Sequence, residues 1–156
     1  MKSSYQLLVF SLDGRHYGIQ LSAVERVVRA VELISVPEAP ELVSGLINVQ
    51  GRIIPVLNIR QRFHLPNRDM TLTDRIIIST TSKRTIAFLV DEVLGVFQLP
   101  PESIKEGRGI FPKLENYLEG VGKINNEAML IYDLNKLFAA SEDYNPSSIQ
   151  EHLQGQ

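Results

Sequence analysis

The 156-residue sequence predicts an all-β protein made of two small barrels that share a hydrophobic core and carry only short helices. Residues 43–63 and 118–138 align without a gap at an offset of 75, so the chain contains a repeat. Each half offers about five short runs rich in strand formers and little helical pattern. Closing such strands into a barrel removes their reactive edges. A unit of about 60 residues has a marginal core, so we expect the two units to pack together.

The repeat consists of like residues at matching positions. The pairs are Gly45/Gly120, Leu46/Val121, Val49/Ile124, Val56/Ile131, Asn58/Asp133, Ile59/Leu134 and Phe63/Phe138. The similarity lies in pattern more than in identical letters, and it extends over about 5–63 and 75–138. It indicates one structural unit that the chain uses twice.

The N-terminal residues are predicted to form a hairpin. Tyr5 to Leu12 and His16 to Leu21 are rich in strand formers, with Asp13-Gly14 between them. This dipeptide is a strong turn signal because glycine adopts positive φ at no steric cost. Ser22 and Glu25 follow with the spacing of a capping box, which predicts a short helical turn.

The rest of the first half is predicted to add strands and one short helix. In order, we expect a strand at 27–31, an irregular segment bracketed by Pro37 and Pro40, a turn at Gln50-Gly51, a strand at 53–57 and a helix from Asn58 to about Phe63. Proline is placed outside the sheet interior because it cannot donate a ladder hydrogen bond. Asparagine is placed before the helix because it is a preferred cap.

The second half is predicted to repeat this order. We expect strands at 75–80, 85–90 and 93–99, a turn at 81–84, a long loop at 102–117 and a last helix from Leu134 to Phe138. Asp133 is predicted to cap this helix, and Asp91 to cap a turn after the second strand.

These patterns divide the chain into one duplicated domain and a tail. The domain covers 1–140, with subdomain one at about 15–70 plus the N-terminal strand and subdomain two at about 74–140. Residues 141–156 form a polar, acidic tail, for which a frayed end and a short helix are both open.

Composition argues against several classes of function. The formal net charge is −2, whereas nucleic-acid binding usually leaves a basic footprint. The chain has no cysteine, so disulfides and thiolate metal sites are impossible. No stretch approaches the roughly 20 apolar residues that span a bilayer. We therefore expect a cytoplasmic protein without membrane insertion.

Catalytic residues, metals and cofactors are not expected from the motifs. The three histidines, His16, His64 and His152, show no metal-ligand spacing. The sequence contains no nucleophile elbow and no phosphate-binding lysine loop. Asp91 and Glu92 would point to opposite faces of a strand and would not share a substrate. These features favour a binding protein over an enzyme.

Residues 45–59 carry a resemblance to a known family. They read Gly-Leu-Ile-Asn-Val-Gln-Gly-Arg-Ile-Ile-Pro-Val-Leu-Asn-Ile, which closely resembles the signature of CheW-like adaptor domains. Six more stretches resemble other parts of the same family and follow one another in the family's order. They are 10–12, 17–19, 36–40, 90–93, 117–122 and 129–134. Together these stretches cover about residues 5–140.

The resemblance implies two SH3-like, five-stranded β-barrel subdomains and a non-catalytic adaptor of bacterial chemotaxis. It implies one surface for the regulatory domain of a CheA-type histidine kinase. It also implies a groove between the subdomains for the cytoplasmic tips of methyl-accepting chemoreceptors. The chain would then be cytoplasmic and recruited to membrane-bound receptor arrays.

A second class of function is a small-ligand or oligonucleotide-binding double β-barrel. A basic groove with exposed aromatic side chains would favour it. Only 7% of the residues are aromatic, there is no tryptophan, and the net charge is negative. The composition therefore favours the adaptor.

The candidate protein-binding residues lie in two stretches. They are Val24, Arg26, Val27, Gly45, Asn48, Gln50, Gly51 and Arg52. The polar residues near the turn, Asn48, Gln50 and Arg52, are expected to be exposed and to make contact. The two glycines are expected to serve backbone geometry first, and for the two valines both a core and a groove position are open.

Two of these residues depart from the family pattern. Gln50 stands where the family has arginine, and Arg26 stands where members often carry glutamate. A reversed charge at an interface alters partner choice more than folding, so we predict a divergent array or a dedicated receptor set. The second copy of the turn, Asn125-Asn126-Glu127, lacks the glycine and the charge pattern. Recognition is therefore expected at the first copy.

Overall fold

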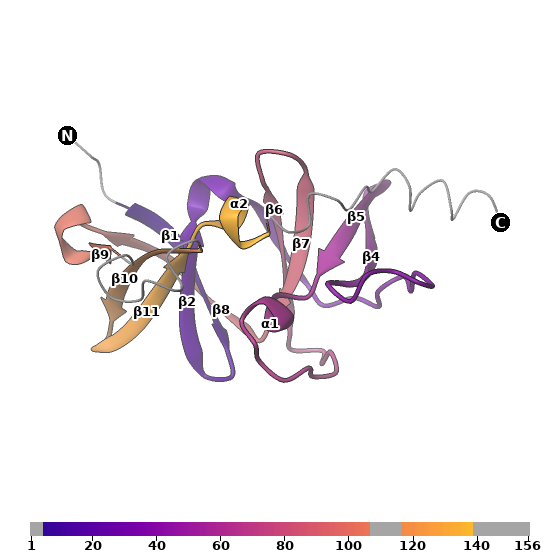
Figure 1. The fold of residues 1–156 in the computed structure, drawn as a ribbon, viewed down its shortest axis with the longest axis horizontal. Coiled ribbons are helices and arrows are strands. Elements are labelled where there is room, and N and C mark those ends of the chain that lie inside the picture. The colour runs from indigo at the N-terminus through magenta and orange to yellow at the C-terminus, as the bar shows by residue number, and fades with distance from the viewer. Residues whose placement is uncertain (1–4, 107–116, 139–156) are drawn as a thin grey trace.

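The computed structural model describes residues 5–106 and 117–138, which form two packed β-sheets with short helices (Figure 1). The first sheet has the order β8-β1-β2-β11-β10-β9. Its strands are β1 (Tyr5–Leu12), β2 (Arg15–Gln20), β8 (Glu92–Leu99), β9 (Lys105–Glu106), β10 (Leu118–Ile124) and β11 (Glu127–Tyr132). The second sheet has the order β3-β6-β7-β5-β4, with β3 (Val24–Arg29), β4 (Val43–Val49), β5 (Arg52–Leu57), β6 (Arg75–Thr80) and β7 (Thr85–Val90). The predicted all-β class is confirmed.

The two halves of the chain exchange their hairpins. β1 and β2 come from the first half but lie in the sheet whose other strands come from the second half, and β6 and β7 show the reverse. A short parallel ladder joins each exchanged hairpin to the other strands of its sheet. β2 pairs with β11 in the first sheet, and β7 pairs with β5 in the second. The predicted subdomains, at about 15–70 and 74–140, follow the sequence repeat. Each sheet, however, contains strands from both ranges.

Each sheet is closed by one bent segment of the chain. After β8, the short helix η2 (Pro101–Ser103) turns the chain so that β9 pairs with β10 at the far edge. After β3, Ile34 reaches β4 in the same way and exchanges backbone hydrogen bonds of 2.7 and 2.9 Å with Leu46. With each bent segment taken as one strand, both sheets form the expected five-stranded barrels.

Gly45 and Gly120 permit this closure at equivalent places. A Cβ atom on Gly45 would lie 2.8 Å from the carbonyl oxygen of Ile34, and one on Gly120 would lie 2.9 Å from that of Lys105. Any larger residue would push the closing segment away from its barrel. The backbone role expected for Gly45 therefore has a steric cause.

Three apolar clusters stabilise the fold. The central cluster lies between the barrels and includes Phe10, Tyr17, Phe88 and Phe138. One cluster inside each barrel consists of Ile47, Ile54, Val56, Ile76, Ile78 and Ala87, and of Leu7, Val9, Ile124, Met129 and Ile131. Successive side chains of a strand point to opposite faces, so continuous apolar runs such as 76–78 supply a barrel interior and the central cluster at once. The predicted shared core is present.

The two short helices begin at the predicted caps. The Asn58 Oδ1 accepts a hydrogen bond from Gln61 N at 3.1 Å at the start of α1 (Ile59–Arg62). Asp133 caps α2 (Leu134–Leu137) in the same way. Both helices lie near the middle of the molecule in Figure 1, between the sheets. No helix of the described part of the chain is long and apolar enough to cross a membrane.

Two other predicted caps are wrong. The chain forms a single 3-10 turn, η1 (Leu21–Ala23), without a side-chain cap from Ser22, and β3 already starts at Val24. Asp91 joins β7 directly to β8, so it has no helix to cap. Most of the predicted 102–117 loop and the 141–156 tail lie outside the described residues.

Candidate protein-binding site

The β4–β5 turn presents most of the candidate residues to solvent. Gln50 and Gly51 have φ angles of 52° and 87°, the geometry of a tight hairpin turn with two left-handed residues. The Asn48 Oδ1 accepts a hydrogen bond from Gly51 N at 2.9 Å, which holds the turn. Asn48, Gln50, Gly51 and Arg52 are all exposed. This leaves Gln50 and Arg52 available for contact.

The equivalent turn of the other barrel has the same backbone geometry. Asn125 and Asn126 have φ angles of 50° and 67°. Asparagine tolerates this conformation better than most residues, so the loss of the glycine does not change the turn. The two copies therefore differ in the chemistry they present and not in shape.

An ion pair joins the β4–β5 turn to β3. Arg52 Nη1 lies 3.1 Å from Glu25 Oε1, with side-chain exposures of 51% and 35%. A pair this exposed contributes little to stability. Its consequence is geometric, because it brings the candidate stretches 24–27 and 48–52 together.

Val27 follows Glu25 of this ion pair by two residues on β3 and is an exposed apolar residue. It is 37% exposed and is paired with Ile77 of β6. Val96 of β8 is 55% exposed and is paired with Leu8 of β1. β3 and β8 each carry one bulge just before these valines, so Val27 and Val96 occupy equivalent places in the two barrels. Their spacing of 69 rather than 75 hides this correspondence in the sequence.

Exposed apolar residues continue along the chain after Val27. The apolar strip consists of Val27, Val31 and Ile34, with exposures of 37, 49 and 40%. Among the other candidates, Val24 is half-buried against the central cluster and Arg26 is exposed. Gly45 is buried under Ile34, so it shapes the strip rather than contacts a partner.

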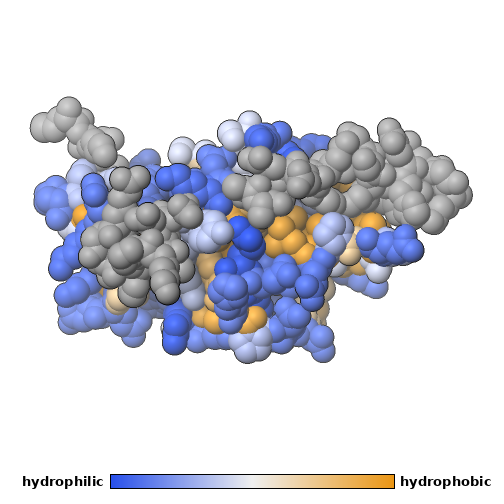
Figure 2. Space-filling view, in the orientation of Figure 1, coloured by the Kyte–Doolittle hydropathy of each residue, from blue (hydrophilic) through white to orange (hydrophobic). Residues whose placement is uncertain are grey.

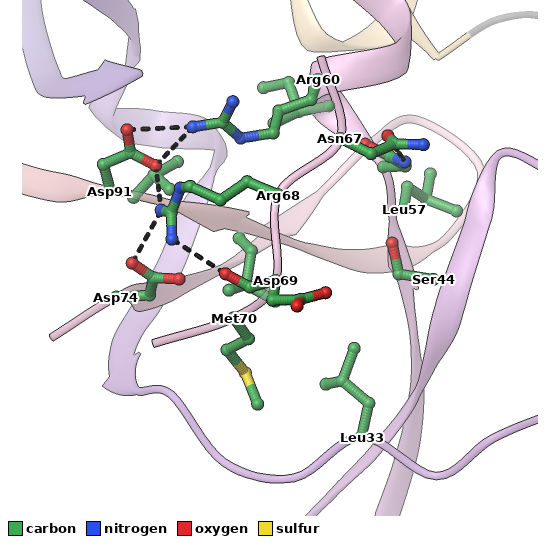
Figure 3. A pocket seen from close by; sticks show the side chains of 14 residues that line it. Leu33, Ser44, Leu57, Arg60, Asn67, Arg68, Asp69, Met70, Asp74 and Asp91 are labelled. Atoms are coloured by element: carbon green, nitrogen blue, oxygen red, sulfur yellow. Dashed lines mark hydrogen bonds and ion pairs between the residues drawn. The ribbon is translucent and has the colours of Figure 1, made fainter. Parts of the chain in front are cut away.

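Five charged residues that the sequence analysis did not group form an ion cluster where the barrels meet. The cluster consists of Asp13, Arg60, Arg68, Asp74 and Asp91, and Figure 3 shows the last four. Arg60 Nη2 lies 2.8 Å from Asp13 Oδ1 and 2.9 Å from Asp91 Oδ1. Asp13 belongs to the β1–β2 turn of one barrel and Arg60 to α1, which follows β5 of the other barrel, so the cluster ties the exchanged hairpin to the barrel of its own half.

Hydrogen bonds hold the Asp74 and Asp91 carboxylates of the ion cluster in their charged form. Burial raises the pKa of Asp91, but hydrogen bonds from Arg68, the Asp13 backbone and Arg60 outweigh it, so its pKa lies below the ordinary value. The pKa of Asp74 is likewise lowered, by Arg68 and Thr71 against burial. The cluster borders a cavity of about 300 Å³ whose lining also includes Leu33, Leu57 and Met70.

The equivalent residue on the other helix is an asparagine. Asn135 of α2 stands 75 positions after Arg60, and its Oδ1 accepts a hydrogen bond from Ser82 N at 2.6 Å. Each helix thus contacts the turn of the hairpin that its own half donates to the other barrel. The first contact is an ion pair and the second is a hydrogen bond from a backbone N–H to an amide oxygen.

The surface around these features is suited to protein contact. The face shown in Figure 2 is largely polar, with apolar atoms near the middle where the sheets meet. Within the described residues, no group of three or more His, Cys, Asp or Glu side chains is placed to hold a metal ion. The CheW-like domain model matches residues 6–142. The chain belongs to the CheW-like family.

Named relatives agree with this membership. The chain is 25% identical over 143 residues to chemotaxis protein CheW of Treponema pallidum, covering 88% of this chain and 84% of the relative. It is 26% identical over 136 residues to chemotaxis protein CheW of Bacillus subtilis, covering 86% and 87%. The crystal structure of scaffolding protein TtCheW from Thermoanaerobacter tengcongensis superposes with a TM-score of 0.77 at 31% identity, covering 86% of this chain and 92% of that one.

The CheW-like family decides between the two predicted classes of function. The chain is a non-catalytic scaffolding protein of chemotaxis, as predicted, rather than a small-ligand or oligonucleotide-binding barrel. The contact residues within this CheW-like chain remain a prediction, as do its individual partners.

Proposed function

We propose that this CheW-like chain couples the regulatory domain of a CheA-type histidine kinase to the cytoplasmic tips of methyl-accepting chemoreceptors. It does so by protein contacts alone, in the cytoplasm, at membrane-bound receptor arrays. The apolar strip and Val24 take the receptor tip, and the β4–β5 turn contacts the kinase domain.

The observation that supports this assignment is the meeting of two chemically different surfaces on one barrel. The apolar strip suits the packing of an amphipathic helix, because exposed apolar residues bordered by polar ones mark interaction sites. The polar turn at Asn48 to Arg52 suits a charge-selective contact. The Glu25–Arg52 pair fixes their relative position, so one chain can hold two partners in register.

Binding measurements with each partner separately test the assignment. Val27→Asp should weaken binding of a receptor cytoplasmic fragment about tenfold or more and leave kinase-domain binding unchanged. Arg52→Glu should have the opposite pattern. Leu72→Asp is the matched control, because Leu72 is 91% exposed and lies outside both surfaces. Calorimetric titrations that show no binding of either partner by the unaltered protein would refute the proposal.

A further inference from the structure

The cavity that borders the ion cluster lies at one end of the barrel formed by β3 to β7. Its volume is about 300 Å³, and its lining includes Ser44 near the start of β4, Leu57 at the end of β5 and Leu89 near the end of β7. β5 runs parallel to β7 and antiparallel to β4, so these three positions lie at the same end of the barrel. The mouths of β-barrels are frequent sites for small ligands, and this volume suits a small one.

Apolar side chains supply much of the lining. Leu33 and Leu89 pack against the cluster inside this barrel, and Leu57 belongs to the central cluster. Met70, from the connection between α1 and β6, adds a further apolar side chain, which points toward Leu33 in Figure 3. A ligand with an aliphatic portion would remove this apolar surface from water.

The two arginines of the lining are already paired with carboxylates. Arg60 bonds Asp13 and Asp91, and Arg68 bonds Asp74 and Asp91. The ion cluster thus holds two positive and three negative side chains. An anionic ligand would have to break these pairs, so the cavity is not suited to one.

Asp69 adds a carboxylate that has no bonding partner among the residues described. Only its backbone carbonyl is bonded, to Arg68 Nη1 at 3.0 Å, and its side chain points away from Arg68 in Figure 3. Ser44 lines the same cavity, and both residues are exposed. The cavity therefore combines an available carboxylate with apolar side chains and an excess of negative charge.

We propose that this cavity binds an alkyl cation, which is a guanidinium or ammonium group on a short aliphatic chain. The cation pairs with Asp69, and a guanidinium can do so through two parallel hydrogen bonds. The aliphatic chain packs against Leu33 and Met70, as the stems of long basic side chains do on apolar surfaces. The site uses neither the apolar strip nor the β4–β5 turn, so it does not depend on the receptor or kinase assignment.

Two sources of this chemistry are a free amine and a basic side chain of another protein. Nuclear magnetic resonance titrations of the labelled full chain distinguish them, with agmatine as the free cation and a capped peptide of one arginine between glycines as the side chain. Saturable shifts of the Ser44, Asp69 and Met70 amide resonances are expected with at least one of them, at a Kd of about 1 mM or lower. The probe that binds more tightly identifies the source. Saturable shifts with neither probe, or equal shifts with the anion butyrate, would overturn the proposal.

Two variants and a matched control sharpen the test. Asp69→Asn should weaken binding of the cation at least about tenfold. Ser44→Phe should fill the cavity and weaken binding to a similar extent without a change in net charge. Glu102→Gln, on the exposed surface of η2 in the other barrel, removes the same charge as Asp69→Asn and should bind like the unaltered protein. Unchanged binding by Asp69→Asn or by a folded Ser44→Phe protein, or an equal loss with Glu102→Gln, contradicts the proposal.

Discussion

Arg62 donates a hydrogen bond from Nε to the backbone carbonyl of Leu137 at 2.7 Å, and these residues occupy equivalent positions of the repeat, 75 residues apart. The guanidinium of Arg62 also lies 5.1 Å from the ring centroid of Tyr117. The C-terminal ends of α1 and α2 therefore meet through equivalent positions of the two halves.

Removing the Arg62 contact should loosen the junction between the helices. Arg62→Ala loses a charge-assisted hydrogen bond and a cation–π contact, so the free energy of unfolding should fall by about 1–3 kcal/mol. Urea denaturation measures this change. Lys136→Ala, an exposed substitution on α2, is the control and should change stability little. Equal stability of the two variants would show that the contact is not structural.

Alanine at either closing glycine should destabilise the barrel that it belongs to. Gly45→Ala and Gly120→Ala each place a Cβ under 3.0 Å from a backbone oxygen, which should cost about 1–3 kcal/mol. Gly14→Ala is the control, because its φ is positive but nothing lies within 4 Å, so only backbone strain of about 1–2 kcal/mol remains. Thermal unfolding of the three variants should rank Gly14→Ala as the mildest.

The ion cluster should make the free energy of unfolding depend on pH. The pKa of Asp91 is lowered in the folded state, so its contribution is complete above the unfolded-state pKa of about 3.9 and is lost as pH falls through the lower folded-state value. Asp91→Asn should be less stable than the unaltered protein at pH 7, and the difference should shrink below pH 4. Glu92→Gln, its exposed neighbour, should follow the unaltered profile. Denaturant titrations between pH 3 and 7 that gave a constant difference for Asp91→Asn would contradict this role.

The features that are local in sequence could be predicted, and those that depend on long-range pairing could not. Asp13-Gly14 and Gln50-Gly51 are recognisable as turns, and Asn58 as a cap, because each acts on neighbours a few residues away. The exchange of hairpins between the two sheets has no such local signal in the sequence. The β1–β2 hairpin would satisfy the same alternation in either sheet, and only the three-dimensional fold shows which strand it pairs with.

The ion cluster and the equivalence of Val27 with Val96 were missed for the same reason. Asp13, Arg60 and Asp91 lie 31 to 78 residues apart, so no motif groups them. The repeat offset changes from 75 in the Gly45 segment to 69 in β3 and β8, which breaks a gapless alignment. A search that allowed a different offset for each strand pair would have paired the two valines.

The departures at Gln50, in the turn assigned to the kinase, and at Arg26, next to Val27 in the chain, should determine which kinase and receptors are served. Both side chains are exposed, so exchanging them should alter recognition with little effect on the fold. The double variant Gln50→Arg, Arg26→Glu should bind a standard receptor tip, through residue 26, and a standard kinase domain, through residue 50, each about tenfold more tightly than the unaltered protein. Lys123→Glu, a charge reversal on β10 of the other barrel, is the control for altered net charge. No gain in affinity for the double variant would rule out the divergent-array hypothesis.

Reconstitution of the three-component assembly tests the coupling function most directly. Full-length kinase and receptor cytoplasmic fragments from the same cell are mixed on vesicles with and without this protein, and the kinase that sediments with the vesicles is measured. Coupling predicts that sedimentation of the kinase requires the unaltered protein and is lost with Val27→Asp or Arg52→Glu, although each variant keeps one partner. Equal kinase sedimentation with and without the protein would contradict it.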